Sequence, residues 1–440
     1  MFEPEAESMP AEQRAGVQQD RLRGLIDRLI EVGGVQGQRL KAIGITGGGD
    51  VTLGDLPRLP MSVKDDMWDG YPLGMLAVDQ SEVVAFHASS GTGGRPALVA
   101  YTRADLALWA RMCARALAAA GATSRSIVHN AYGYGLFTGG LGIHQGAIEL
   151  GAAVVPASGG MTARQVTLIR DLRPDILTCT PSYAIRLGEA LAEAGLAGEL
   201  SLSAGVFGAE PWSAELRARI EGLLGLRALD IYGLSEVIGP GVAAECIEAA
   251  DGLHVNEDHF LVEAIDPVSG APVPDGTPGE LVFSTPTREA LPLLRYRTGD
   301  IAALRRGVCV CGRTLVKMSK ITGRRDDMLV IRGVNVYPSE VERVLLAEQA
   351  LCPDYLLVLD EREGMPRLIA CCEYRTGPPG GSPGAARPLV ADLESRLREE
   401  LGVRVGVRVL PAGTVPRAEV GKAVRVARWR EGDPPLPGLD

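Results

Sequence analysis

The sequence predicts an α/β fold with a large N-terminal domain and a small α+β domain at the C-terminus. Between residues 84 and 236, short apolar runs alternate with helical stretches, the rhythm of parallel strands covered by helices. After residue 257, apolar residues alternate with turn residues, which indicates an antiparallel, barrel-like subdomain. The chain has 440 residues and exceeds the ~250–300 residues of one core, so at least two domains are expected.

The first elements follow from apolar spacing. Leucine and isoleucine recur at helical intervals from residue 22 to 30, which predicts an amphipathic helix over residues 8–32. Further helices are predicted at 104–120 and 213–224, and parallel strands at 126–131, 152–156, 175–179, 204–207 and 228–232. Several of these runs end in Gly, Ser or Thr clusters, where open α/β sheets bind ligands.

Residues 261–265 and 279–284 are predicted strands of the antiparallel subdomain. A boundary near residue 323 divides the chain into domains 1–322 and 323–440. In the second domain we predict strands at 327–336, 355–359 and 368–373 and helices at 339–349 and 389–401. The Gly/Pro-rich segment 375–388 is expected to be a mobile loop, and residues 434–440 a frayed tail.

Composition excludes several classes of protein. The net charge of −10 argues against nucleic-acid binding. No apolar stretch is long enough to cross a bilayer, and the acidic N-terminus is no secretory signal. The eight scattered cysteines lack the density of a secreted disulfide scaffold. We therefore expect a cytoplasmic protein without a membrane partner.

The segment His87–Pro96 places hydroxyls, glycines and a cation in one turn, which favours phosphate binding. It lacks the Gly-Lys-Ser/Thr of a Walker loop. Taken alone, a turn of this composition is more often a plain surface loop. The candidate phosphate-binding residues are Ser89, Ser90, Gly91, Thr92, Gly93 and Arg95.

A second motif, Asp230–Glu236, follows an apolar run and supplies a ring, a hydroxyl and a carboxylate. We interpret it as a platform for a nucleotide and a metal: Tyr232 stacks on a purine, Ser235 binds a phosphate and Glu236 holds Mg²⁺. The alternative is an ordinary strand end.

The order and spacing of these motifs, together with others, resemble the phenylacetate-CoA ligase family of the adenylate-forming acyl-CoA synthetases. The similar segments are 64–66, 132–140, 180–183, 207–211, 252–260, 296–300, 323–328 and 421–423. Members of this family adenylate an aromatic carboxylic acid with ATP and then exchange AMP for coenzyme A. The resemblance implies the same reaction, cofactors and substrates here.

The resemblance also implies nucleotide contacts. Residues 89–95 would hold the β- and γ-phosphates, with Arg95 where Lys is usual, and Asp300 would bind the ribose, although alone it reads as a turn cap. Lys64 would contact the phosphates, the alternative being a solvated cluster with its two neighbouring aspartates. Residues implied around the adenine are Gly208, Ala209, Glu210, Pro211, Asp230, Ile231, Tyr232 and Gly233.

In the C-terminal domain, Lys422 matches the catalytic lysine that bridges the carboxylate and the α-phosphate. Asp326 matches the hinge of this domain, with Arg324 beside it contacting the nucleotide. Rotation about the hinge would present Gly333 and Arg332 to coenzyme A. The alternative for the hinge is a simple Gly/Arg-rich turn.

Aromatic residues alternating with glycines indicate a slot for the aryl ring, although aromatics are equally ordinary in a core. The candidate residues are Tyr132, Tyr134, Phe137 and Gln145. Gln145 stands where the family usually carries Tyr, so the pocket is expected to be more polar than one for phenylacetate. A hydroxy- or aminobenzoate would suit it.

Cys309 and Cys311, with Cys246 and His254 upstream, offer three sulfurs and one nitrogen for a structural Zn²⁺. Because Cys-x-Cys is tighter than the common Cys-x-x-Cys, spacing alone favours buried free thiols. The resemblance favours zinc, with His259 as the reserve ligand.

Other functions share these motifs. The aryl group can pass to a carrier-protein thiol or an amine instead of coenzyme A, and a basic groove using Arg305, Arg306 or Arg332 would favour coenzyme A. A nucleotide-binding homologue without activity is a different class. The resemblance also suggests a homodimer.

Overall fold

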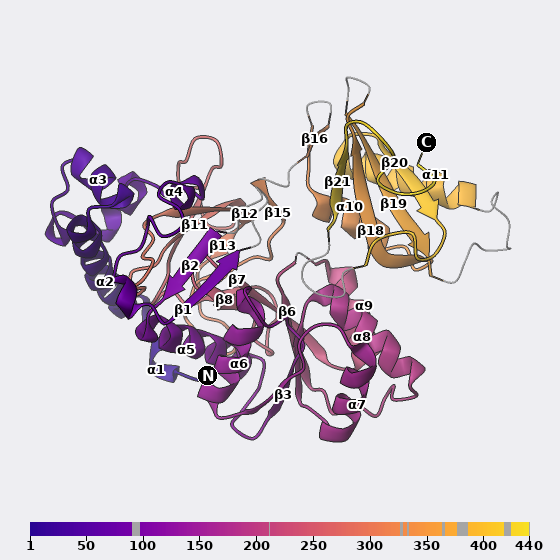
Figure 1. Cartoon of the computed structure of the whole chain (residues 1–440), viewed down its shortest axis with the longest axis horizontal. Helices are drawn as coiled ribbons and strands as arrows, with labels where there is room; N and C mark the ends of the chain where they lie inside the picture. Colours follow the sequence, from indigo (N-terminus) through magenta and orange to yellow (C-terminus); the bar gives the residue numbers. More distant parts are fainter. Residues whose placement is uncertain are drawn as a thin grey trace. The chain divides into compact units, whose positions relative to one another are not determined.

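The computed structural model describes residues 1–89, 97–210, 212–325, 329–331, 334–362, 366–375, 386–417 and 424–439. The chain forms two compact units (Figure 1). The first unit comprises Met1–Cys179, Gly198–Ala209 and Leu226–Ile321, and the second comprises Thr180–Ala197, Glu210–Gly225 and Thr322–Asp440.

Among the described residues, a nine-stranded sheet forms the centre of the first unit, in the order β13-β14-β9-β8-β7-β6-β5-β3-β4. Its parallel part consists of β7 (Arg227–Leu234), β6 (Ala204–Gly208), β5 (Ile176–Cys179), β3 (Ile127–Asn130) and β4 (Ala153–Pro156). These are the five runs predicted as parallel strands, and that prediction is confirmed. Most of their residues are buried, as expected for strands covered on both faces.

The rest of the sheet is antiparallel and consists of β8 (Gly239–Ala244), β9 (Leu253–Val255), β14 (Lys317–Met318) and β13 (Leu304–Arg305). β7 and β8 approach so closely that a Cβ on Gly233 would clash with the carbonyl group of Gly239. Glycine is therefore required at the base of this hairpin. The short turn between the two strands carries Glu236.

Helices α5 (Arg103–Ala119) and α6 (Thr138–Leu150) pack against each other and against β8. The buried ring of Trp109 on α5 joins the three elements, because a Cβ on Gly142 or Gly239 would clash with it or crowd it. α7 (Thr162–Leu172) also belongs to this unit.

The N-terminal segment of the first unit is helical. It contains α1 (Pro4–Glu7), α2 (Ala11–Val32), α3 (Val35–Ala42), η1 (Gly48–Asp50), η2 (Leu53–Arg58), α4 (Asp65–Trp68) and η3 (Gln80–Glu82). The predicted first helix is present, but it begins at Ala11 rather than Ser8, because Pro10 occupies its N-cap. Its apolar face, including Leu22 and Ile26, forms a separate core with Leu294.

Two antiparallel pieces complete the first unit. β10 (Leu261–Ile265), β11 (Gly279–Ser284) and β12 (Tyr296–Ala302) form one sheet, which confirms the antiparallel part of the prediction. β1 (Ala85–Ser89) and β2 (Ala97–Tyr101) form a hairpin in which Ser89 pairs with Ala97. Residues 90–96, the centre of the predicted phosphate loop, lie between these partners and outside the described residues.

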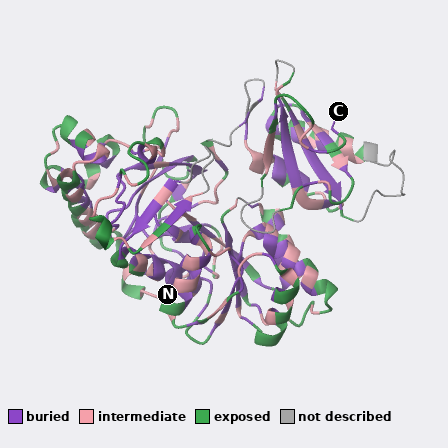
Figure 2. Cartoon of the chain, viewed as in Figure 1, coloured by how far each residue is buried: buried purple, intermediate pink, exposed green. Residues whose placement is uncertain are grey.

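The second unit has its own sheet, β20 (Val405–Leu410), β19 (Arg367–Tyr374), β18 (Leu351–Asp360) and β21 (Val426–Trp429). It also contains β15 (Gly323–Arg324), the hairpin of β16 (Leu329–Ile331) and β17 (Val334–Val336), and helices α8 (Pro181–Glu193), α9 (Ala214–Leu224), α10 (Pro338–Leu346) and α11 (Ala386–Leu401). Figure 2 shows buried residues along its strands.

The C-terminal tail differs from the prediction. Leu436 and Leu439 are only 2% and 4% exposed and pack with Trp429 in a small core. The tail is therefore anchored rather than frayed, because its two leucines outweigh its Pro/Gly-rich composition. The predicted loop 375–388 lies mainly outside the described residues, and its last residues already belong to α11.

Across the described residues, the helices are too short or too polar to cross a bilayer.

Candidate active site

Glu236 lies in the turn that follows β7, and its side chain is nearly enclosed at 4% exposure for the residue. Lys64, at the start of α4, places its Nζ 3.5 Å from Glu236 Oε1. The sequence interpretation left Lys64 between a phosphate contact and a surface cluster with two aspartates. The structure pairs it with the predicted magnesium ligand, and Asp66 pairs with Arg39 instead.

Tyr232 and Asp300 meet across two sheets. The Tyr232 hydroxyl donates a hydrogen bond to Asp300 Oδ2 at 2.7 Å, and both residues are buried. The Tyr232 ring stacks on Phe283, with centroids 6.0 Å apart and planes at 27°. Asp300, the residue predicted to bind the ribose, is therefore held in place by Tyr232, the residue predicted to stack on the purine.

The carboxyl ends of β6 and β7 lie side by side, with Gly208 paired to Ile231. A Cβ on Gly208 would clash with the Ile231 carbonyl, so only glycine fits there. The next residue, Ala209, has a φ of 72°, a strained conformation for a residue with a side chain. Local strain and strand ends of this kind mark ligand sites of open α/β sheets.

Glu210 belongs to the second unit, where its Oε1 accepts a hydrogen bond from the Ser182 backbone N–H at 2.6 Å. Ser182 lies in the first turn of α8, so the carboxylate sits at a helix N-terminus, where negative charge is favoured. This residue therefore has a structural partner beside its predicted nucleotide role. Pro211 lies outside the described residues.

Ser235 and Ser89 supply hydroxyls to this region. Ser235 Oγ lies 3.3 Å from Thr138 Oγ1, which begins α6. Ser89 Oγ is buried at the end of β1 with no hydrogen-bond partner among the described residues. Sequence analysis did not assign a role to Thr138, although a hydroxyl residue before two glycines at a helix start was a usable signal.

The predicted aryl-pocket residues differ in exposure. Tyr132 is buried and Phe137 is exposed, while Tyr134 and Gln145 are intermediate. The Tyr134 hydroxyl accepts a hydrogen bond from Asn130 Nδ2 at 2.8 Å and lies 3.1 Å from His144 Nδ1. Burial raises the pKa of Tyr134 to about 12, so the hydroxyl stays protonated.

Cys246, His254, Cys309 and Cys311 form a compact cluster, with their ligand atoms all within 4.8 Å of one another. The Sγ atoms of Cys246 and Cys309 are 3.8 Å apart, and Cys311 Sγ is 3.7 Å from His254 Nε2. Two sulfurs bound tetrahedrally at ~2.3 Å from Zn²⁺ would be separated by about 3.8 Å. The cluster therefore has the dimensions of a metal site.

Two ligands of the cluster, Cys309 and His254, have lowered pKa values, which favours the deprotonated form that binds a metal. Burial works to raise the pKa of Cys309, but hydrogen bonds from the Cys311 backbone and Lys317 lower it overall. Burial, with the nearby charges of Arg313 and Lys317, lowers the pKa of His254 to about 3, so its imidazole is neutral. His259, the predicted reserve ligand, is outside the cluster and lies beside Thr287 and Asp258 instead.

Several predicted residues fall elsewhere. Arg324 lies on β15 in the second unit. Ser90, Gly91, Thr92, Gly93, Arg95, Asp326, Arg332, Gly333 and Lys422 lie outside the described residues.

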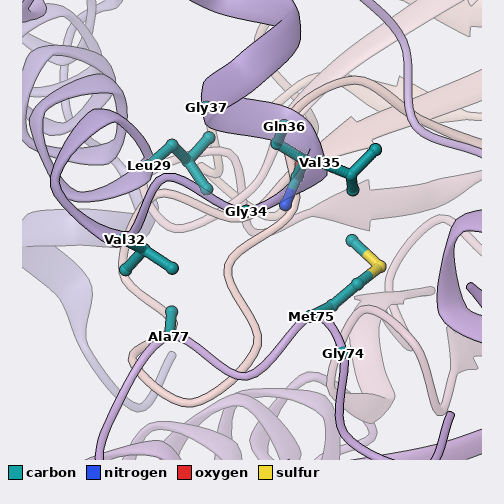
Figure 3. A pocket seen from close by; sticks show the side chains of 9 residues that line it. All are labelled: Leu29, Val32, Gly34, Val35, Gln36, Gly37, Gly74, Met75 and Ala77. Atoms are coloured by element: carbon teal, nitrogen blue, oxygen red, sulfur yellow. The ribbon is translucent and has the colours of Figure 1, made fainter. Parts of the chain in front are cut away.

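A small hollow between α2, α3 and residues 74–77 has only about 20 Å³ of interior space (Figure 3). That is room for about one water molecule. Its lining, which includes Val32, Val35 and Met75, has no titratable side chain. This hollow is too small for an aromatic acid or a nucleotide.

Comparison with known proteins identifies the family. Residues 55–288 match the AMP-binding enzymes, and residues 333–430 match the AMP-binding enzyme C-terminal domain. The chain is 46% identical to a phenylacetate-coenzyme A ligase of Thermus thermophilus over 98% of this chain and all of that protein. The chain belongs to the phenylacetate-CoA ligase family. The ligase of Escherichia coli is 43% identical over 96% of each chain.

A solved structure agrees with this family assignment. The 2-hydroxyisobutyryl-CoA ligase in its postadenylation state matches with a TM-score of 0.90 and 27% identity, covering 97% of this chain and 92% of that one. This phenylacetate-CoA ligase family member therefore has the adenylate-forming fold and is an acid–thiol ligase. The family resemblance drawn from the motifs is confirmed.

Proposed function

We propose that this protein is an ATP-dependent ligase that joins an aromatic carboxylic acid to coenzyme A. It adenylates the acid and releases pyrophosphate, and the thiol of coenzyme A then attacks the acyl carbon and releases AMP. The observation that supports this most is the gathering of the Lys64–Glu236 and Tyr232–Asp300 pairs near the carboxyl end of β7. Family membership supports the same reaction.

The nucleotide roles follow from this arrangement. Residues 89–95 hold the β- and γ-phosphates, Asp300 binds the ribose hydroxyls, and the ends of β6 and β7 line the adenine. Glu236 is the proposed Mg²⁺ ligand; its enclosed carboxylate fits, because Mg²⁺ is commonly held by one or two carboxylates together with substrate phosphates. Bound Mg²⁺ would neutralise the phosphate charge, and Lys64 adds a cation on the same carboxylate.

Residues 323–440 are proposed to act as a mobile domain, with Asp326 as its hinge. In one state Lys422 bridges the carboxylate and the α-phosphate, with Arg324 contacting the nucleotide. In the other state Arg332 and Gly333 face coenzyme A. A cation between two anions lowers the barrier to their reaction, which is why adenylation needs this lysine.

We propose phenylacetate or a substituted benzoate as the acid, bound near Tyr132, Tyr134, Phe137 and Gln145. The hydrogen-bonded pair of Tyr134 and His144 supports a partly polar pocket. A relative covering half of this chain at 27% identity is a 4-chlorobenzoate–CoA ligase, which also favours the benzoate class.

The cysteine–histidine cluster is proposed to hold one structural Zn²⁺ through Cys246, His254, Cys309 and Cys311. Its sulfur and nitrogen donors suit zinc, and the 3.8 Å sulfur separation fits tetrahedral binding. With all four coordination positions filled by protein atoms, the ion would brace the loop of residues 306–316 between β13 and β14 rather than take part in the reaction.

The proposal extends to the cellular location, the oligomeric state and the acyl acceptor. We propose a cytoplasmic homodimer that uses coenzyme A. Transfer to a carrier protein or an amine is the alternative, because adenylation is common to both routes.

Pyrophosphate release from ATP and Mg²⁺ tests the proposal, with phenylacetate, benzoate and hydroxy- or aminobenzoates tried with and without coenzyme A. We expect acid-dependent release and an aryl-CoA of the correct mass. Release without a thioester would favour a carrier or amine acceptor, and no release with any acid would favour an inactive nucleotide-binding protein.

A further inference from the structure

The guanidinium of Arg288 is fully buried and contacts the backbone of the turn that carries Glu236. Arg288 belongs to the connection between β11 and β12 and is 0% exposed. Within the described part of the chain, no ion pair joins it to a carboxylate. Instead, it donates hydrogen bonds to backbone carbonyls and lies over the ring of Tyr101, with its Cζ 4.6 Å from the centroid.

The bonded carbonyls belong to two separate motifs. Arg288 Nη2 donates to the Ala100 oxygen at 2.6 Å. Its Nη1 donates to the oxygens of Val237 at 2.9 Å and Glu236 at 3.2 Å. Ala100 lies in β2, the strand that leaves the phosphate loop, whereas Glu236 and Val237 lie in the turn of the proposed Mg²⁺ ligand. One side chain therefore bridges the backbones of β2 and of the Glu236 turn.

Two further side chains extend this arrangement along the turn. The Tyr101 hydroxyl donates to the Ile238 oxygen at 2.9 Å, and Trp109 Nε1 donates to the Pro240 oxygen at 3.0 Å. Tyr101 and Trp109 stack with centroids 5.3 Å apart. The carbonyls of Glu236, Val237, Ile238 and Pro240 are thus bound by donors from three elements, rather than by regular strand pairing alone.

The segment carrying Arg288 is itself anchored. The backbone N–H groups of Glu289 and Ala290 donate to the buried carboxylate of Asp105 at 2.8 and 3.0 Å. The Thr102 hydroxyl donates to Glu289 Oε2 at 2.8 Å. Arg288 therefore extends from a segment fixed on the N-terminus of α5.

A buried charge without an ionic partner is a costly way to stabilise a fold, because desolvation opposes it and carbonyl dipoles compensate only in part. An apolar side chain of similar volume would fill the space at lower cost. What the guanidinium adds is a rigid planar fork that fixes acceptors on two nitrogens at once, a geometry that the three donors on the single nitrogen of an ammonium do not reproduce. This favours a positional role over a purely stabilising one.

We propose that Arg288 is a positioning residue that holds the Glu236 turn against β2, so that Mg²⁺ and the triphosphate are bound together. This inference rests on the proposed role of Glu236 as the Mg²⁺ ligand. Arg288 contacts neither reactant; it acts through the backbones of Glu236 and Ala100.

The test compares Arg288→Lys with the wild type and with Arg115→Lys as a matched control. Arg115 is also buried, at 3% exposure, but it pairs with Asp258 away from Glu236. The Lys variant at 288 keeps the charge and loses the fork. Binding of ATP is measured by calorimetry with and without Mg²⁺, and pyrophosphate release is measured against Mg²⁺, ATP and aryl acid.

We expect Arg288→Lys to weaken ATP binding in the presence of Mg²⁺ by about tenfold, the effect of one charge-assisted hydrogen bond. Binding of metal-free ATP and the KM for the acid should change by less than about twofold. Arg115→Lys should lower Tm without changing the Mg²⁺ dependence. Tyr101→Phe, which removes one hydroxyl, should shift the Mg²⁺ dependence in the same direction by a smaller factor.

The proposal is overturned if both substitutions at 288 and 101 leave the Mg²⁺ dependence unchanged, or if Arg115→Lys shifts it equally. Glu236→Gln separates this from failure of the function. If Glu236→Gln leaves the Mg²⁺ dependence unchanged, the magnesium assignment fails. If it alters that dependence but Arg288→Lys and Tyr101→Phe do not, only the positioning role fails.

Discussion

At the scale of single residues, Glu342 on α10 gives the second unit a pH-dependent stability. It is 3% exposed, and its Oε2 accepts a hydrogen bond from the Tyr355 hydroxyl at 2.9 Å. Burial raises its pKa from 4.5 to about 7; Arg425 opposes this shift, whereas the charges of Glu210 and Glu215 reinforce it. The folded state therefore retains a proton that the unfolded chain has already released.

The direction of this pH effect on stability follows from the raised pKa of Glu342. Below pH 4.5 the carboxyl is neutral in both states, and its contribution to stability is fully present; this contribution is lost as the pH rises to about 7. The loss is about 3 kcal/mol, from ~1.4 kcal/mol per pKa unit. Glu342→Gln, which stays neutral, should remove this part of the pH dependence.

Hydrogen exchange of β18 in the full chain measures the effect. We expect the protection of the Glu342→Gln variant relative to the wild type to increase between pH 5 and pH 8, with exchange corrected for its intrinsic pH dependence. Exposed Glu399→Gln is the control and should show no such trend. A constant difference between Glu342→Gln and the wild type across this range would show that Glu342 is ionised in the folded state.

Residue-level prediction worked from motifs that carry their own chemistry, and the roles assigned to those residues stay predictions. Tyr232 and Glu236 were predicted from the ring and the carboxylate of one motif, and Asp300 from the family resemblance; the structure joins Tyr232 to Asp300 and Glu236 to Lys64. Sequence analysis singled out neither Thr138 nor Arg288, the residue that we propose positions the Glu236 turn. Their contacts are with carbonyl and hydroxyl partners far away in sequence, which no local pattern encodes.

At the scale of elements, the proposed zinc loop, residues 306–316 between β13 and β14, combines an anchored base with an exposed tip. Arg313 Nε donates to the buried Glu7 carboxylate at 2.7 Å, and Arg14 donates to Thr314, so α1 and α2 hold the base. Val308 and Val310 at the tip are strongly exposed. The base has side-chain partners on α1 and α2, whereas the tip is closed by backbone hydrogen bonds of Cys309 with Arg313 and Gly312, beside the cysteine–histidine cluster.

We therefore expect the purified protein to contain about one Zn²⁺ per chain, as a closed four-ligand site holds one ion. Cys311→Ser should reduce this content and make the bond after Val308 or Val310 sensitive to elastase. Mass spectrometry of the digest and metal analysis check both outcomes. Half-buried Cys352→Ser in the second unit is the matched control.

Zinc content that is unchanged in Cys311→Ser would contradict the ligand assignment. A metal-free wild type that resists elastase as well as the zinc-bound protein does would contradict zinc as the brace of the loop.

The elements themselves were predictable to different degrees. The five parallel strands are continuous apolar runs, so the pattern alone located them. β8 was missed because its sequence contains two glycines and a proline, residues that usually break strands. Its glycines fit close neighbours, because a Cβ on Gly239 would clash with the Trp109 ring and one on Gly241 would crowd the backbone of α5.

At the scale of the whole molecule, the two units have separate hydrophobic cores, which is the physical basis for independent bodies in one chain. Most of the proposed nucleotide contacts belong to the first unit, and Lys422 belongs to the second. Length and the change of pattern near residue 323 predicted two domains. Sequence patterns did not indicate that α8 and α9 group with the C-terminal residues, because this grouping depends on tertiary contacts.

This division predicts that the two half-reactions can be separated by one substitution. In Lys422→Ala, pyrophosphate release should fall by about 10²–10³-fold, because a charge that stabilises the transition state is lost. Formation of aryl-CoA from supplied aryl-adenylate should stay within about threefold of the wild type, because coenzyme A attack on the ready-made adenylate needs no bridge between carboxylate and α-phosphate. Exposed Lys41→Ala is the control for both assays. Equal losses in the two half-reactions would mean that Lys422 supports the fold or both states. An unchanged rate of adenylation would remove Lys422 from the proposed site. The ratio of the two rates therefore decides whether the second unit delivers its lysine for one step alone.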